Sequence, residues 1–120
     1  MNRSGTITAP ISRKEGSIIE REINNNGDLA ITHFEKLKEF EKFTLVKFIL
    51  ETGRTHQIRV HSKFIGHPIL GDTLYGSPSL LINRQALHAY KVKFLHPIFK
   101  KELIIEANIP NDIQYIIKEQ

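Results

Sequence analysis

The sequence predicts an α+β domain, in which a mostly antiparallel (mixed) sheet carries one central helix and a short terminal helix. Several segments rich in β-branched and aromatic residues are separated by turn signals, and one segment between them has a helical start, face and stop. At 120 residues and 40% hydrophobic content, the chain is long enough for one domain with a core and too short for two.

The first 28 residues are predicted to form loops and at most one short edge strand. Pro10, Gly16 and the run Asn-Asn-Asn-Gly-Asp at 24–28 punctuate a segment that carries many charges. Within that run, Asn26 and Gly27 are suited to a tight turn.

Four later segments have the composition of strands. Residues 29–38 alternate loosely, residues 43–50 read FTLVKFIL, and 39–42 would connect the two as a hairpin. Residues 87–95 alternate apolar and basic side chains, and 102–107 would return as the partner strand. A terminal helix is expected to begin at Pro110-Asn111-Asp112 and to bury Ile113, Ile116 and Ile117.

Residues 55–65 are predicted to form the central helix. Thr55 can serve as the N-cap, Gly66 stands where a left-handed C-terminal cap is needed, and Pro68 prevents continuation. The expected buried face of this helix consists of Ile58, His61 and Ile65.

Charge and composition limit the function without identifying it. The 17 basic and 13 acidic residues give a net charge of +4, which favours a polyanionic partner, although many basic domains bind none. The chain has no cysteine, which excludes disulfides and thiolate metal sites, and it has no apolar run long enough for a membrane span. We therefore expect a soluble, cytoplasmic protein with no membrane partner.

Residues 50–60, LETGRTHQIRV, place two arginines, a histidine and a glutamine between apolar runs. Arg54 lies at the expected helix entrance, where its guanidinium and the free backbone N–H groups suit a phosphate. Arg59 lies four residues before Lys63, so the two share a cationic face. The alternative is that these side chains form an ordinary solvated helix face.

Three segments, LETGRTHQIRV (50–60), GHPILGDTLYG (66–76) and ALHAYKVKFLHP (86–97), together resemble the C-terminal half of the catalytic domain of the RluA-type RNA pseudouridine synthases. In that family, this half folds with an N-terminal half into one mixed sheet, and the active-site cleft lies between them. The resemblance implies that 1–120 is a single partial domain. The family's His-Arg-Leu-Asp motif, which holds the nucleophilic aspartate, is not in the sequence.

The resemblance implies the isomerisation of a flipped-out uridine to pseudouridine, with RNA as partner and with no cofactor and no metal. In the family, the arginine of the Gln-Ile-Arg step pairs with the catalytic aspartate, which here assigns Arg59 to an aspartate that the chain lacks. The ribosomal RNA of the large subunit is the favoured RNA class. The residues expected to contact RNA are Arg54, Thr55, His56, Gln57 and Lys63.

The three aspartates of the chain, Asp28, Asp72 and Asp112, all have ordinary structural interpretations, and Asp72 belongs to a structural turn beside the cleft. The chain by itself is therefore predicted to be catalytically inert. The alternative is a non-catalytic RNA-binding module that retains the cationic half of the cleft. His56 and His61 are five residues apart and lack a third ligand, so no metal site is predicted.

Half of a sheet would leave an unpaired edge and exposed apolar side chains. Such edges are prone to pair with a second chain. We therefore expect a homo-oligomer that forms through the exposed sheet edge.

Overall fold

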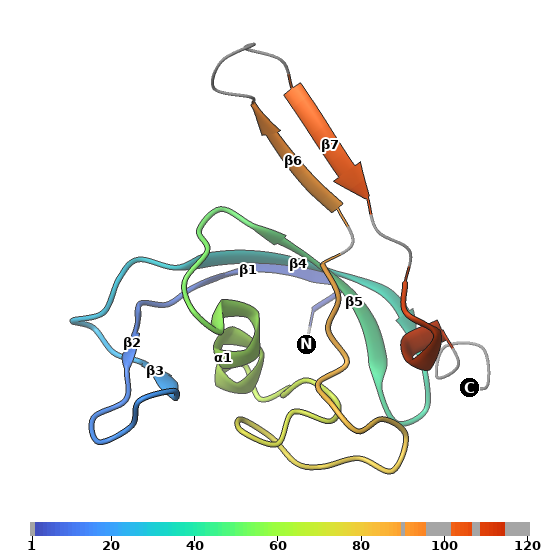
Figure 1. The fold of residues 1–120 in the computed structure, drawn as a ribbon, viewed down its shortest axis with the longest axis horizontal. Helices are drawn as coiled ribbons and strands as arrows, with labels where there is room; N and C mark the ends of the chain where they lie inside the picture. The colour runs from blue at the N-terminus through green and yellow to red at the C-terminus, as the bar shows by residue number, and fades with distance from the viewer. Residues whose placement is uncertain (1, 90, 96–101, 107–108, 115–120) are drawn as a thin grey trace.

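The computed structural model describes residues 2–89, 91–95, 102–106 and 109–114, with strands 91–95 and 102–106 described by their backbone alone. Its regular structure consists of three antiparallel sheets, the α-helix α1 (Gln57–Phe64) and a short helical segment at 111–114 (Figure 1). Every strand pairing that the structure describes is antiparallel, so the predicted α+β class with a mostly antiparallel sheet is confirmed.

The largest sheet has the order β1-β4-β5. Its hairpin consists of β4 (Ile31–Glu39) and β5 (Thr44–Leu50), in agreement with the two strands predicted from composition. The register shifts between Lys36 and Lys38, where the ladder is irregular. The partner on the other side of β4 is β1 (Ser4–Thr8), which places Ile7 opposite Thr32.

The prediction for the first 28 residues is wrong, because this segment forms three strands. Besides β1, a short ribbon pairs β2 (Ile11–Arg13) with β3 (Arg21–Ile23). The partner of β1 lies more than twenty residues away in the sequence, so local composition carries little information about it. The tight turn is present, but Asn24 opens it by accepting a hydrogen bond from the Gly27 N–H at 2.8 Å.

The central helix α1 spans Gln57–Phe64, two residues later than predicted at its start. The N-cap is His56 in a left-handed conformation, without a side-chain capping bond, so the assignment of Thr55 as the N-cap is wrong. The predicted stop is confirmed: Gly66 has φ +84°, and its N–H donates to the Lys63 carbonyl at 2.9 Å.

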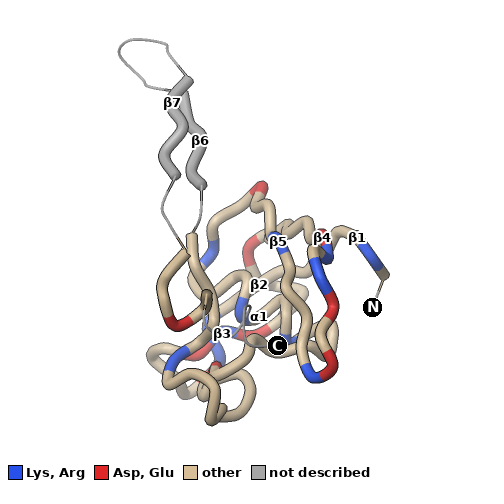
Figure 2. The backbone as a smooth tube through the Cα atoms, turned by 90° about the vertical axis from the view of Figure 1, so that its right-hand side faces the viewer, with Lys and Arg blue, Asp and Glu red and all other residues tan. Residues whose placement is uncertain are grey.

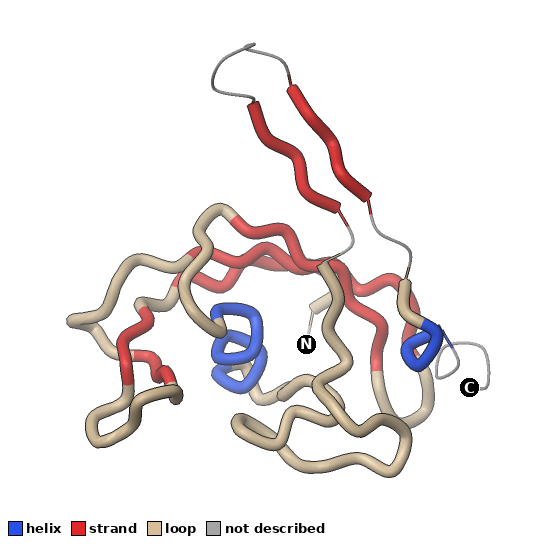
Figure 3. Tube along the Cα trace, viewed as in Figure 1, coloured by secondary structure: helices blue, strands red, loops and turns tan. Residues whose placement is uncertain are grey.

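Helix α1 packs against β3 and β4 (Figures 1 and 3), and of its predicted buried face only His61 is confirmed as buried. The buried helix residues are Gln57, Val60, His61 and Ser62, whereas Ile58 and Ile65 are only partly buried. Gln57 and His61 find hydrogen-bond partners in the strands and loops beside the helix, whereas Ser62 Oγ is buried without a partner among the described residues. Val60 joins the small apolar core, which it shares with Ile11, Ala30 and Tyr75.

From 65 to 89, the described residues after α1 form no helix or strand (Figure 3). Strand β6 (Lys91–Leu95) then pairs with β7 (Glu102–Glu106), so the predicted partners are confirmed, although 87–89 lie outside any strand. The final helical segment covers 111–114, and Asp112 accepts two hydrogen bonds from the Arg84 guanidinium. The predicted burial of Ile116 and Ile117 lies outside the described residues.

Candidate nucleic-acid interface

The loop that leads into α1 is held by the side chain of Gln57, which is 3% exposed. Its Oε1 atom accepts hydrogen bonds from the Thr52 hydroxyl at 2.7 Å and from the Arg54 N–H at 2.9 Å. Its Nε2 atom donates to the Ile31 carbonyl and to Thr32 Oγ1, both at 3.0 Å. The sequence predicts that Gln57 contacts RNA, but in the structure its amide is fully used in holding the loop on β4.

The same network continues through Thr32 to His61, whose side chain is completely buried. His61 Nε2 lies 2.9 Å from the Ala9 carbonyl, which can only accept, so the ring proton is on Nε2. Nδ1 therefore accepts from the Thr32 hydroxyl at 2.7 Å. Burial lowers the pKa of His61, which keeps the ring neutral.

Lowering the pH from about 7.5 to about 5.5 is expected to reduce the free energy of unfolding, because the unfolded state binds a proton at His61 that the folded state does not. The stability that the neutral His61 ring contributes is fully present above the ordinary pKa of histidine. It is lost as the pH falls from that value toward the lowered pKa of the folded state. For one proton the loss is at most about 1.4 kcal/mol per pH unit. Urea unfolding at both pH values should show a weaker pH dependence in His61→Gln than in the wild type, and an equal dependence would contradict the assignment.

Arg54 is exposed and is held at only one edge of its guanidinium. Its Nε donates to the Leu29 carbonyl at 2.8 Å, and no described residue bonds to its two terminal nitrogens. The group therefore presents terminal N–H donors in a fixed plane, which suits a phosphate. Thr55, which follows it, is also exposed.

Arg59 and Asp72 form a bidentate ion pair. Arg59 Nε lies 2.8 Å from Asp72 Oδ2, and Nη2 lies 2.9 Å from Oδ1. The Asp72 side chain is fully buried and that of Arg59 is 15% exposed. Burial alone would raise the pKa of Asp72, but Arg59 and the N–H groups of Tyr75 and Leu74 together hold this pKa below its usual value.

This pairing gives Arg59 a carboxylate partner within the chain. The sequence assigns Arg59 to an aspartate that the chain lacks, and it assigns Asp72 to a turn. Asp72 does close that turn, since Oδ1 accepts from the Leu74 and Tyr75 N–H groups at 3.1 and 3.2 Å, but it also binds Arg59. No feature of the sequence reveals the pair, because thirteen positions and a loop without regular structure separate its members.

Tyr75 connects this pair to the helix entrance. Its hydroxyl accepts from the Arg21 N–H at 2.8 Å and lies 2.7 Å from His56 Nδ1. Its ring contacts the Arg59 guanidinium, with 5.1 Å between the charge centre and the ring centroid. The sequence indicates no such role for Tyr75 or Arg21, because these two residues lie more than fifty positions apart.

His56 is partly buried at this junction. Burial and the positive charges of Arg59 and Arg21 lower the pKa of His56, and Asp72 opposes them only in part. Around neutral pH the ring is therefore uncharged.

Lys63 is exposed on α1 and lines a hollow of about 210 Å3 between α1 and the β2–β3 ribbon. Lys14 and Arg21 also line it, together with the carboxylates of Glu20 and Glu22. Lys14 pairs with Glu20 at 2.9 Å. The hollow is therefore mixed in charge, and Lys63 has no partner among the residues that the structure describes.

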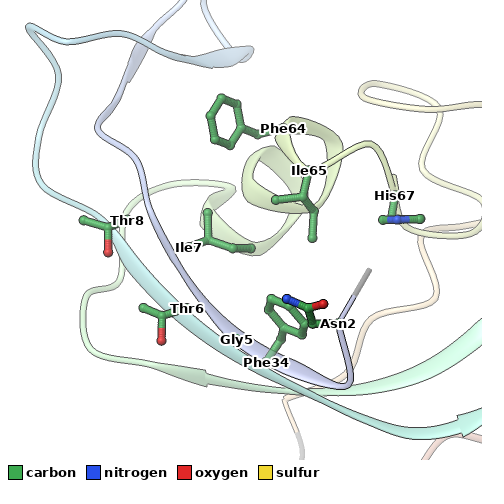
Figure 4. Close-up of a pocket in the computed structure, with 9 residues that line it drawn as sticks. All are labelled: Asn2, Gly5, Thr6, Ile7, Thr8, Phe34, Phe64, Ile65 and His67. Atoms are coloured by element: carbon green, nitrogen blue, oxygen red, sulfur yellow. The ribbon is translucent and has the colours of Figure 1, made fainter.

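A larger hollow of about 530 Å3 lies at the C-terminal end of α1, facing β1 and β4 (Figure 4). Phe64 and Ile65 from the helix end, Ile7 from β1 and Phe34 from β4 give it apolar walls, and His67 stands at its rim. The residues that line it include none of those predicted to contact RNA.

Among the described residues, lysine and arginine are interleaved with acidic residues along the chain. Figure 2 shows blue and red segments interleaved, for instance along the β4–β5 hairpin. The candidate interface is therefore defined by individual groups, namely Arg54, Thr55 and His56 at the start of α1 and Lys63 in its last turn. Within the described part of the chain, no three His, Asp or Glu side chains come together as a metal site, and no helix is long and apolar enough to cross a bilayer.

Comparison with known proteins identifies the family. The sequence model of the RNA pseudouridylate synthases matches residues 1–63. The chain is 46% identical over 114 residues to YjbO of Bacillus subtilis, described as an uncharacterized RNA pseudouridine synthase, with 95% of this chain and 40% of that protein covered. It is 37% identical over 127 residues to the ribosomal large subunit pseudouridine synthase D of Vibrio cholerae, with 94% and 39% covered.

A solved structure agrees on the fold. Human RNA Pseudouridylate Synthase Domain Containing 4 superposes with a TM-score of 0.67 at 21% identity, over 97% of this chain and 56% of that one. The chain spans about two fifths of the length of the curated relatives it matches. The resemblance stated from the three motifs is confirmed, and the chain belongs to the RNA pseudouridylate synthase family.

Proposed function

We propose that this chain supplies one wall of the active site of an RNA pseudouridine synthase, which isomerises uridine to pseudouridine in the ribosomal RNA of the large subunit. The observation that carries the proposal is the entrance to α1, where Arg54 presents terminal guanidinium nitrogens beside His56 in a chain of this family. Such groups can hold the phosphates on either side of a flipped base. The relative named for the large ribosomal subunit favours that RNA class.

The chain by itself is proposed to be inert, as part of a larger catalytic domain. Each of its three aspartates has a position that argues against a nucleophile. Asp72 is fully buried under Arg59, Asp112 is paired with Arg84, and Asp28 forms a β-bridge to Ile11 beside a turn. A nucleophilic carboxylate must reach the flipped base, so the proposal requires one from outside these 120 residues.

The experiment is a tritium-release assay on uridine-labelled ribosomal RNA. The 120-residue chain is expected to release no tritium above background, while a full-length relative assayed in parallel shows that the RNA is a competent substrate. Turnover by the pure chain would contradict the proposed inertness. That Arg59 pairs with the nucleophilic aspartate stays a prediction. Within this chain Arg59 is paired with Asp72, which would compete with that aspartate.

The second candidate is a non-catalytic RNA-binding module. The exposed Arg54 and Lys63 favour it, because they offer phosphate contacts without any reacting group. The two candidates differ in the upstream reading frame: a His-Arg-Leu-Asp segment in frame before Met1 supports the synthase, and its absence supports the module.

For either candidate, Lys63→Ala is expected to reduce the salt dependence of RNA binding. Removing one phosphate contact lowers the slope of log affinity against log salt by about 1. Fluorescence anisotropy over a salt series measures the slope, with Lys42→Ala as a control because Lys42 is exposed in the turn between β4 and β5. Equal slopes for the two variants would argue against a role for Lys63.

We also propose that the chain self-associates through β5, which is an edge strand of its sheet and exposes Ile49 (53%) and Leu50 (43%). Sedimentation velocity at micromolar protein is expected to show a dimer or larger species. Ile49→Lys is expected to shift it toward the monomer, because a lysine at an edge opposes pairing with a second chain. A wild-type protein that is strictly monomeric would contradict this.

A further inference from the structure

His56 has an unusual backbone conformation for a residue with a side chain. Its φ of 56° and ψ of 22° are left-handed, and no other non-glycine residue in the described part of the chain has a positive φ. Such a conformation is unfavourable and persists only where the surrounding contacts impose it. The side chain of His56 is held by a hydrogen bond to Tyr75, with 2.7 Å between Nδ1 and the hydroxyl oxygen.

The proton positions in that contact follow from its geometry. The Tyr75 hydroxyl oxygen already accepts the Arg21 N–H, so its own proton is free to be donated. Tyr75 is 5% exposed, and a hydroxyl proton left without an acceptor there would be costly. The arrangement that satisfies both groups has Tyr75 O–H donating to Nδ1 of a neutral His56, which leaves the imidazole proton on Nε2.

The surrounding charges favour the same state. Arg59 lies over the Tyr75 ring, and the backbone N–H of Arg21 donates to the Tyr75 hydroxyl. The positive charges of both arginine side chains oppose a positive charge on His56. Asp72, which would favour the charge, is engaged by Arg59. The arginine–aspartate pair thus orients Tyr75, and Tyr75 orients His56.

We infer that His56 is a neutral hydrogen-bond donor to an oxygen of the RNA backbone through Nε2–H, with Tyr75 as the positioning residue that sets its tautomer. This inference deepens the proposed function and rests on it. The ring is partly exposed, and Nε2 has no partner among the described residues. Arg54, two positions earlier in the chain, offers a phosphate-binding group at the same helix entrance.

The first test reads the tautomer without RNA. Nuclear magnetic resonance of the 15N-labelled chain is expected to show His56 with its proton on Nε2, with the signal assigned by its loss in His56→Asn. Tyr75→Phe retains the ring beneath Arg59 and removes only the hydroxyl, so the pKa of His56 is expected to rise. A proton on Nδ1 in the wild type, or an unchanged titration in Tyr75→Phe, would overturn the inference.

The second test uses a fluorescein-labelled RNA stem–loop with uridines in its loop. His56→Asn retains a residue type that tolerates the left-handed conformation, and it is expected to weaken binding about tenfold at every salt concentration. The line of log affinity against log salt should shift without a change of slope, because a neutral donor releases no counterion. The control is His67→Asn at the far end of α1, which is expected to bind as the wild type does.

The outcomes separate the inference from the proposed function. Wild-type binding with His56→Asn unaffected overturns the inference alone, and so does a reduced slope in His56→Asn, which would show a charged imidazole. Failure of the wild type to bind RNA contradicts the proposed function and the inference together. Circular dichroism verifies that His56→Asn is folded. His56→Gly also lacks the imidazole and removes the backbone strain, so it serves as a second variant in the same binding test.

Discussion

Replacing Arg59 with methionine is expected to lower the free energy of unfolding by about 3–5 kcal/mol. The methionine retains much of the packing volume but leaves Asp72, which is fully buried, without its bidentate partner. An uncompensated buried carboxylate is among the costliest defects in a folded protein. Chemical denaturation of wild type and variant at neutral pH measures the difference.

The chain provides a matched control in its second arginine–aspartate pair. Arg84 and Asp112 also form two hydrogen bonds, but their side chains are 38% and 39% exposed. Arg84 also donates to the Gln85 and Leu87 carbonyls, but its carboxylate partner is not buried, so Arg84→Met is expected to cost less than Arg59→Met. Similar losses in Arg59→Met and Arg84→Met would show that burial does not decide the importance of the Arg59–Asp72 pair.

The pH dependence adds an independent readout. The folded state holds the pKa of Asp72 below its ordinary value of 3.8, so the stability from this group is complete well above that value and is lost as the pH falls below it. In Arg59→Met this acid-induced loss should become smaller. A loss of activity in a complete enzyme without a loss of stability would instead support contact between Arg59 and a nucleophile.

Gly71→Ala is expected to destabilise the protein by about 3 kcal/mol or more, because it adds a steric clash to an unfavourable backbone conformation. Gly71 has φ +77°, and a Cβ atom there would lie 2.2 Å from the Arg84 carbonyl oxygen and 2.9 Å from Ile82 Cγ2. The first of these contacts is with backbone, which cannot move aside as a side-chain tip can. Thermal and urea denaturation measure the loss.

Gly66→Ala separates the two causes. Gly66 has φ +84°, but no atom lies within 4 Å of the position that an alanine methyl would occupy, so only the left-handed conformation is penalised, by about 1 kcal/mol. Equal losses at both glycines would contradict the steric argument. The substitution at Gly71 should also disturb the position of the adjacent Asp72, and hence the contact between Arg59 and Tyr75.

Local sequence signals are reliable where an element and its partner are neighbours. The hairpin β4–β5, the pairing of β6 with β7 and the end of α1 at Gly66 all depend on short-range patterns of side chains and turns. The strands β1 and β3 escape such signals. β1 is short and polar and pairs with the distant β4, and β3 has only three residues, two of them charged, and contacts the distant helix α1.

By itself, the sequence determined the family and the α+β class, because motifs and periodicity are properties of residue order. Only the tertiary structure decided which polar groups meet. It buried Gln57 and His61 more deeply than the isoleucines expected at the helix core, and it bonded Arg59 to Asp72 and Tyr75 to His56. The physical reason is that burying the Gln57 amide and the His61 ring requires hydrogen-bond partners, and those partners come from strands and loops that only folding brings together.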